Sequence, residues 1–184
     1  AAGETAVFSY QVTADLPAGD IFNEVTAASS LGTDSAYAYL NAVTRLQVAH
    51  LAPFAADPGT AVTVTLNSAP ALTGFAYGDS TGYIELDPGS YLVEIFPEGS
   101  PTAAISSTLD LVEGMDYTAA AIGDGINQPL SLMALEDDNR APAAGSFKLR
   151  LGHLAPFADT LPGTTADVRL QDGTVVLNDV VFGD

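Results

Sequence analysis

The chain has 184 residues, of which 23 are Asp or Glu and 5 are Lys or Arg, so its formal net charge is -18. It contains no Cys and no Trp, which excludes disulfides and thiolate metal sites. Five basic residues are too few for a nucleic-acid-binding surface, and no run approaches the roughly 20 apolar residues of a membrane-spanning helix.

Apolar and polar residues alternate along most of the chain, with the period of two that is typical of β-strands. Turn sequences rich in Gly, Pro and Asp separate these runs, as in a β-sandwich. The best candidate for a helix is Asp34–Asn41. The predicted strands, in chain order, are residues 5–12, 61–66, 90–96, 116–122, 147–154, 166–170 and 173–181.

An internal repeat is the strongest signal in the sequence. Leu46–Ala55 recurs as Leu149–Ala158, and both copies contain His-Leu-Ala-Pro-Phe-Ala. The Pro-Gly-Thr turn at 58–60 returns at 162–164. The repeat divides the chain into an N-terminal extension, a first copy, a linker and a partial second copy, with the boundaries 1–44, 45–139, 140–145 and 146–184.

Several motifs of the first copy resemble the DUF4397 domain family. They are His50 with the following Pro, the turn Tyr77-Gly78-Asp79, the segment Leu86–Tyr91 and the run Asp137–Gly145. His-Leu-Ala-Pro-Phe replaces the family's usual His-Ala-Ser-Pro-Asp. The resemblance implies a secreted β-sandwich module of bacteria or archaea, and it implies no particular activity.

We therefore expect an all-β protein made of tandem immunoglobulin-like antiparallel β-sandwiches, of which the second is incomplete. The counterparts of residues 81–135 are missing from the second copy. Three strands cannot close a sandwich, and about 600 Å² of open apolar surface would forgo on the order of 15 kcal/mol. A strand from elsewhere must complete it: from residues 1–44 of the same chain, from a neighbouring molecule, or from a part of the protein outside this sequence.

The candidate donor strand is the N-terminal run that contains Val7, Phe8, Tyr10 and Val12. The residues expected to receive it, near the C-terminus, are Val175, Leu177 and Val181. A head-to-tail exchange of this kind need not close on itself, so it would produce a filament.

Candidate chemical groups are few. His50 and His153 occupy equivalent positions and are interpreted as strand-end residues bonded to loop backbone, with metal ligation or base catalysis as the alternative. Asp79, Asp137 and Asp138 are weak calcium candidates because Ca²⁺ prefers oxygen ligands. No nucleophile motif or phosphate-binding loop is present, so neither an enzyme nor a required cofactor is expected.

The sequence thus predicts a secreted, acidic structural protein that self-assembles at the cell surface. The runner-up is a monomeric module that binds a carbohydrate or a surface protein. The acidic charge fits an extracellular location, because charges spaced about 20 Å apart on a protein of this mass are screened over roughly 8 Å in physiological salt.

Overall fold

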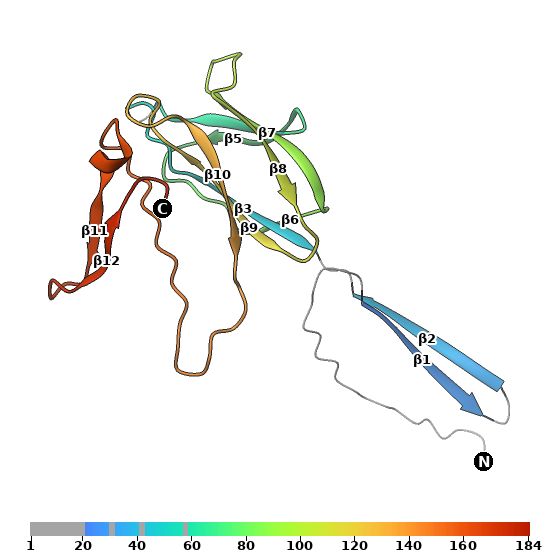
Figure 1. Cartoon of the computed structure of the whole chain (residues 1–184). Coiled ribbons are helices and arrows are strands. Elements are labelled where there is room, and N and C mark those ends of the chain that lie inside the picture. Colours follow the sequence, from blue (N-terminus) through green and yellow to red (C-terminus); the bar gives the residue numbers. More distant parts are fainter. Residues whose placement is uncertain (1–20, 30–31, 41–42, 57–58) are drawn as a thin grey trace. The chain divides into compact units, whose positions relative to one another are not determined.

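A computed structural model describes residues 21–29, 32–40, 43–56 and 59–184 (Figure 1). The chain forms two units, Ala1–Ala42 and Val43–Asp184. Among the described residues there is no α-helix, and no helix has the length and apolar character needed to cross a membrane.

The first unit contains an antiparallel hairpin. Its strands are β1 (Ile21–Ser29) and β2 (Gly32–Leu40), paired from Ile21 opposite Leu40 to Ser29 opposite Gly32. The helix expected at Asp34–Asn41 is therefore wrong, because most of that segment lies in β2. Its Tyr-Ala-Tyr-Leu run is as compatible with a strand as with a helix, and pairing with β1 decides between them. The predicted strand at 5–12, with Val7, Phe8, Tyr10 and Val12, lies outside the described residues.

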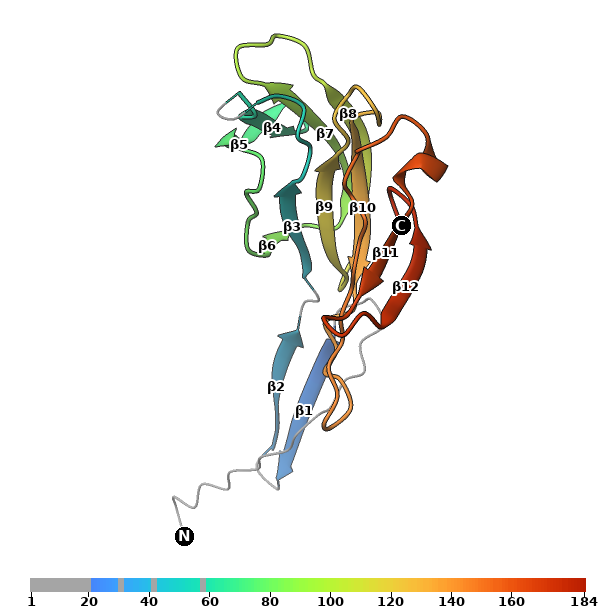
Figure 2. The same cartoon turned by 90° about the vertical axis from the view of Figure 1, so that its left-hand side faces the viewer.

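The second unit is built on a β-sandwich of two four-stranded sheets (Figure 2). In one sheet the order is β10 (Ser131–Asp137), β9 (Asp116–Ile122), β3 (Thr44–His50) and β6 (Ile84–Leu86). In the other it is β5 (Ala69–Phe75), β4 (Val62–Leu66), β7 (Gly89–Pro97) and β8 (Ile105–Leu111).

All strand pairs of this sandwich are antiparallel except β3 with β9. The predicted antiparallel β-sandwich is confirmed, and β3 with β9 is a parallel pair within it. Between β3 and β9 the chain forms the four strands of the opposite sheet and the short edge strand β6. This long crossover brings β9 beside β3 in the same direction. The predicted strands at 61–66, 90–96 and 116–122 are confirmed as β4, β7 and β9.

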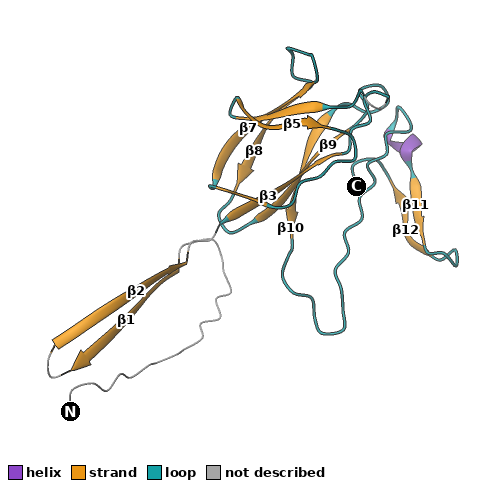
Figure 3. Cartoon of the chain, turned by 180° about the vertical axis from the view of Figure 1, so that it is seen from behind, coloured by secondary structure: helices purple, strands orange, loops and turns teal. Residues whose placement is uncertain are grey.

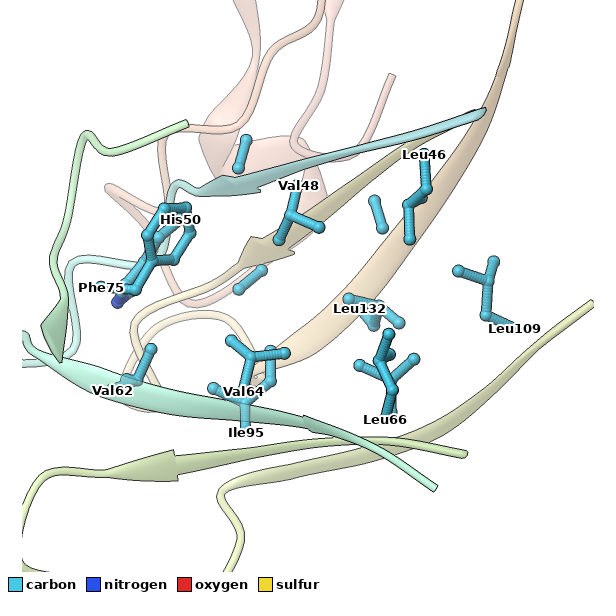
Figure 4. A pocket seen from close by; sticks show the side chains of 14 residues that line it. Leu46, Val48, His50, Val62, Val64, Leu66, Phe75, Ile95, Leu109 and Leu132 are labelled. Carbon is cyan, nitrogen blue, oxygen red and sulfur yellow. The ribbon is translucent and has the colours of Figure 1, made fainter. Parts of the chain in front are cut away.

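Alternate residues of both sheets fill the core between them (Figure 4). Val62 and Val64 of β4, and Val93 and Ile95 of β7, are each at most 4 % exposed. A cavity of only about 20 Å³ remains among the core side chains. The core is therefore closed without any residue of the second copy in it.

The second copy begins after a linker without strands and contains β11 (Ala166–Arg169), β12 (Val175–Val180) and the short 3₁₀ turn η1 (Leu161–Thr164) (Figure 3). The strands predicted at 166–170 and 173–181 are confirmed as the β11–β12 hairpin. The strand predicted at 147–154 is wrong, since that segment pairs with no other strand among the described residues.

Truncation of a core side chain should lower the stability of the sandwich. Leu109→Ala removes a side chain that is 4 % exposed, so we expect the free energy of unfolding to drop by about 2–5 kcal/mol. Val112→Ala, at a residue 52 % exposed on the adjoining turn, should change it by less than about 0.5 kcal/mol. Urea denaturation followed by circular dichroism measures both, and equal losses would contradict the described core.

Candidate functional site

His50 fastens the end of β3 to the loops around it. Its Nε2 lies 2.9 Å from the carbonyl oxygen of Thr60, and its Nδ1 accepts a hydrogen bond of 3.3 Å from the Ala52 N–H. These partners require a neutral ring with the proton on Nε2. The ring stacks on Phe54 at 5.7 Å. Burial lowers the pKa of His50 below its ordinary value, although the Thr60 carbonyl and the charge of Asp79 act in the opposite direction.

The second copy repeats this arrangement bond for bond. His153 Nε2 lies 2.7 Å from the carbonyl oxygen of Thr164, the Ala155 N–H donates to its Nδ1, and the ring stacks on Phe157 at 5.5 Å. In both copies the Gly-Asp turn closes back on the histidine backbone, through Gly78 and Asp79 or through Gly183 and Asp184. The structure thus places both histidines in loop-fastening positions.

The β11–β12 hairpin also repeats β4–β5, down to its irregularities. Val62, Val64 and Thr65 pair with Phe75, Leu72 and Pro70, with a register shift at each step. Ala166, Val168 and Arg169 pair with Val180, Leu177 and Val175, with shifts at the same two steps. Residues 153–184 therefore repeat the histidine loop and the β4–β5 hairpin, whereas the segment equivalent to β3 in sequence is not a strand.

What differs is the environment of the equivalent side chains. Leu46 is 3 % exposed in the first copy, whereas its counterpart Leu149 is 68 % exposed. The strands that flank β3 are β6 and β9, and residues 146–184 contain no counterpart of either. The exposed apolar side chains of this region are Phe147, Leu149, Leu151, Phe157, Leu161, Leu170, Val175, Val176 and Leu177.

The opposite, polar side of residues 146–153 is held against the first sandwich. Arg150 donates to the Asp137 carboxylate and to the Glu136 carbonyl. The Lys148 ammonium lies 2.8 Å from the Asp138 carboxylate. Lysine and arginine alternate with Phe147, Leu149 and Leu151, so one side of this segment is satisfied while the apolar side stays open. We call that open side, together with the β11–β12 hairpin, the open C-terminal face.

Two amides hold the His153 loop on the sandwich. The Asn127 side chain donates to the Pro156 carbonyl at 3.0 Å, and the Gln128 side chain donates to the Ala158 carbonyl at 2.8 Å. Leu154 and Phe182 pack against the small buried residues of β3 and β9. A cleft of about 500 Å³ remains beside this contact, lined among others by Tyr77, Asp124, Leu154, Pro156 and Phe157.

The structure does not bring the three calcium candidates together. Asp79 accepts a hydrogen bond from the Ala76 N–H within its own turn. Asp137 accepts from Tyr83 and Thr118 in addition to Arg150. Hydrogen bonds from Arg140 and Lys148 lower the pKa of Asp138. Among the described residues no group of three or more His, Asp or Glu side chains is arranged to hold a metal ion.

The assembly candidates at the C-terminal end differ in accessibility. Val175 and Leu177 are exposed on β12, by 41 % and 39 %. Val181 is half-buried just after β12, and its N–H donates to the Asp184 carboxylate in the closing turn. Two of the three side chains are therefore exposed.

Sequence reasoning missed a polar network on the outer side of the first sheet. Arg45 Nε donates to Asp116 at 2.7 Å, and the same guanidinium lies 5.2 Å from the Tyr83 ring centre. Asn139 bridges Asp116 and Tyr83. The hydrogen bond from Arg45 lowers the pKa of Asp116. The parallel β3–β9 pairing that joins these residues is not visible as a sequence pattern.

These observations define the class: an all-β protein with one closed β-sandwich, followed by strands that repeat its first part. The sequence profile of the DUF4397 family, described as a domain of unknown function, matches residues 44–164. The chain therefore belongs to this family. No match was found among curated proteins.

The buried His50 should make stability depend on pH. Because its pKa is lowered on folding, the unfolded chain takes up a proton below about pH 6.5 while the folded chain resists it. The stability that the neutral His50 contributes is therefore fully present above that pH and is lost as the pH falls through the lowered pKa of the folded state. His50→Gln keeps a donor for Thr60 but does not titrate, so its free energy of unfolding should vary less between pH 7.5 and 5. Equal pH dependence in the two proteins, measured by urea denaturation, would refute this assignment.

Proposed function

We propose that the protein is an extracellular structural subunit that self-associates through its open C-terminal face, by accepting strands from a second copy. The supporting observation is the contrast between equivalent residues, since Leu46 is 3 % exposed and Leu149 is 68 % exposed. The role needs no catalytic group.

Two unsatisfied features of this face favour strand addition over a flat contact. The backbone of residues 147–152 belongs to no sheet, although the aligned segment in β3 is paired on both sides. The edge of β11 that corresponds to the β7-paired edge of β4 has no partner among the described residues. An added strand would satisfy backbone groups and cover apolar side chains together, which is the basis of β-augmentation.

The acidic charge fits assembly outside the cell. Each copy carries a formal charge of -18, and repulsion between copies is screened over about 8 Å at physiological ionic strength. Under these conditions the screened repulsion leaves polymer growth to depend on short-range contacts at the open C-terminal face.

Charging the open C-terminal face should abolish assembly. Leu149→Asp places a carboxylate where a partner strand would lie, and it should cost little folding stability because the side chain is 68 % exposed. Ile126→Asp, at a side chain 85 % exposed on the β9–β10 loop, is the matched control and should assemble like the wild type. Light scattering and electron microscopy of the purified proteins measure the assembly. A wild-type protein that stays monomeric at high concentration would refute the proposal.

The cleft beside the His153 loop favours a second candidate function, binding of a carbohydrate. Tyr77 and Phe157 line the cleft and are 53 % and 58 % exposed, and exposed aromatic rings can stack on sugar rings. The Asp124 carboxylate is already engaged by the backbone N–H groups of residues 126–128, so recognition would depend on the aromatic side chains.

Under this second candidate, a monomeric protein should give a signal on a glycan array, and Tyr77→Ala should reduce that signal at least tenfold. Tyr83→Phe, which keeps an exposed aromatic ring outside the cleft, should retain it. An array without signal would remove the carbohydrate hypothesis.

A further inference from the structure

The N-terminal unit carries a second, hidden repeat. The ten residues Thr13–Phe22 align without a gap with Thr108–Tyr117. Both segments read Thr-x-Asp-Leu-x-x-Gly-x-x-aromatic. In the sandwich this stretch ends β8, makes the turn and begins β9.

The shared residues are the ones that shape that turn. Leu111 and Tyr117 are buried, at 4 % and 5 % exposure, and Gly114 has φ +75°, which disfavours other residues. The Tyr117 hydroxyl accepts a hydrogen bond of 3.3 Å from the Val112 N–H. A Leu, a Gly and an aromatic residue at these spacings therefore have structural reasons in the first sandwich.

Strands follow this motif at matching places in both parts. The alignment matches Ile21, the first residue of β1, with Asp116, the first residue of β9. The β1–β2 hairpin then corresponds to β9–β10. In the β1–β2 hairpin Ile21 pairs with Leu40, and in the β9–β10 hairpin Asp116 pairs with Asp137, so the aligned pairings differ by two positions. Because two is an even number, aligned residues of the two hairpins keep the same alternation between the sides of the sheet. Each hairpin is followed along the chain by a His-Leu-Ala-Pro-Phe segment.

The two ends of the chain thus resemble different parts of the first sandwich, although the described residues of these ends contain no counterpart of β6, β7 or β8. Residues 146–184 supply counterparts of β3, β4 and β5, and the N-terminal hairpin supplies counterparts of β9 and β10. Resting on the proposed self-assembly, we infer that β1 of one copy lies parallel to residues 146–153 of the next copy, in the place that β9 holds beside β3. The register of Leu46 opposite Tyr117 assigns Phe22 of one copy to Leu149 of the next.

Charge disfavours contact between two N-terminal units. Residues 1–42 contain five acidic residues and no Lys or Arg. Three of the chain's 5 basic residues, Lys148, Arg150 and Arg169, lie in residues 146–184. Residues 146–184 also contain five acidic residues, so their net charge is -2, against -5 for residues 1–42. Head-to-tail contact therefore meets less charge repulsion than contact between two N-terminal units.

Engineered cysteines test the register directly, because the natural chain has no Cys. Residues opposite each other on neighbouring strands lie about 5 Å apart, within disulfide reach. Mixing full-length Phe22→Cys with Leu149→Cys should yield a disulfide-linked heterodimer under mild oxidation. Ala28→Cys, about 20 Å further along β1, is the matched control and should link to Leu149→Cys at least tenfold less.

The outcomes separate this inference from the proposed function. A link that forms inside the Phe22→Cys/Leu149→Cys double variant, without a mixed dimer, would show closure within one chain and overturn the inference. Polymers that form without a Phe22–Leu149 link would overturn it while leaving self-assembly intact. A protein that neither links nor assembles would overturn both.

A second variant checks the same register without cysteine. Glu24 aligns with Ala119, which is 3 % exposed in the first sandwich. Burying a carboxylate opposes assembly, so Glu24→Ala should increase polymer mass in light scattering at a fixed protein concentration. An unchanged or smaller mass would contradict the assigned position of β1.

Discussion

The backbone of a β-strand must find hydrogen-bond partners on its edges, and this requirement governs the molecule. In the first sandwich β3 is paired with β6 on one side and with β9 on the other. A related segment with the same alternation of apolar and polar residues occurs at 146–153, but the flanking strands do not follow it among residues 146–184. That segment therefore lies outside any sheet, and its apolar side chains are exposed.

The comparison of the two copies separates local from cooperative structure. The histidine, its two ring partners and the Gly-Asp turn recur in the second copy without counterparts of the strands that flank β3, so these contacts do not require those strands. The β11–β12 register is equally local. Burial is cooperative, since Leu149 matches Leu46 in sequence and not in exposure. Repeated sequence thus guarantees the framework of the second copy and leaves its core to be supplied.

Much of this could be predicted from the sequence, for identifiable reasons. The alternating runs that became β4, β7 and β9 are long and bounded by turn residues, and the family resemblance covered the part that the DUF4397 profile matches. The segment 147–154 was misjudged because alternation records which side of a strand is apolar and not whether a neighbour exists. The helix predicted at Asp34–Asn41 is wrong because its Tyr-Ala-Tyr-Leu run is compatible with a helix or a strand, and pairing with the preceding strand β1 decides between them. The Arg45–Asp116 network depends on the parallel β3–β9 pair, which no local pattern encodes.

In sequence order, the closed sandwich lies between the N-terminal hairpin and the partial second copy, and the proposed assembly would join these two ends. A contact between unlike ends of identical chains is heterologous, so every added copy presents a fresh end, and growth stops only if the rotation between copies closes a ring. The first sandwich needs no partner, because its core is already filled. It would act as a folded spacer between successive junctions. Each proposed junction would combine counterparts of β3, β4 and β5 from one chain with counterparts of β9 and β10 from the next.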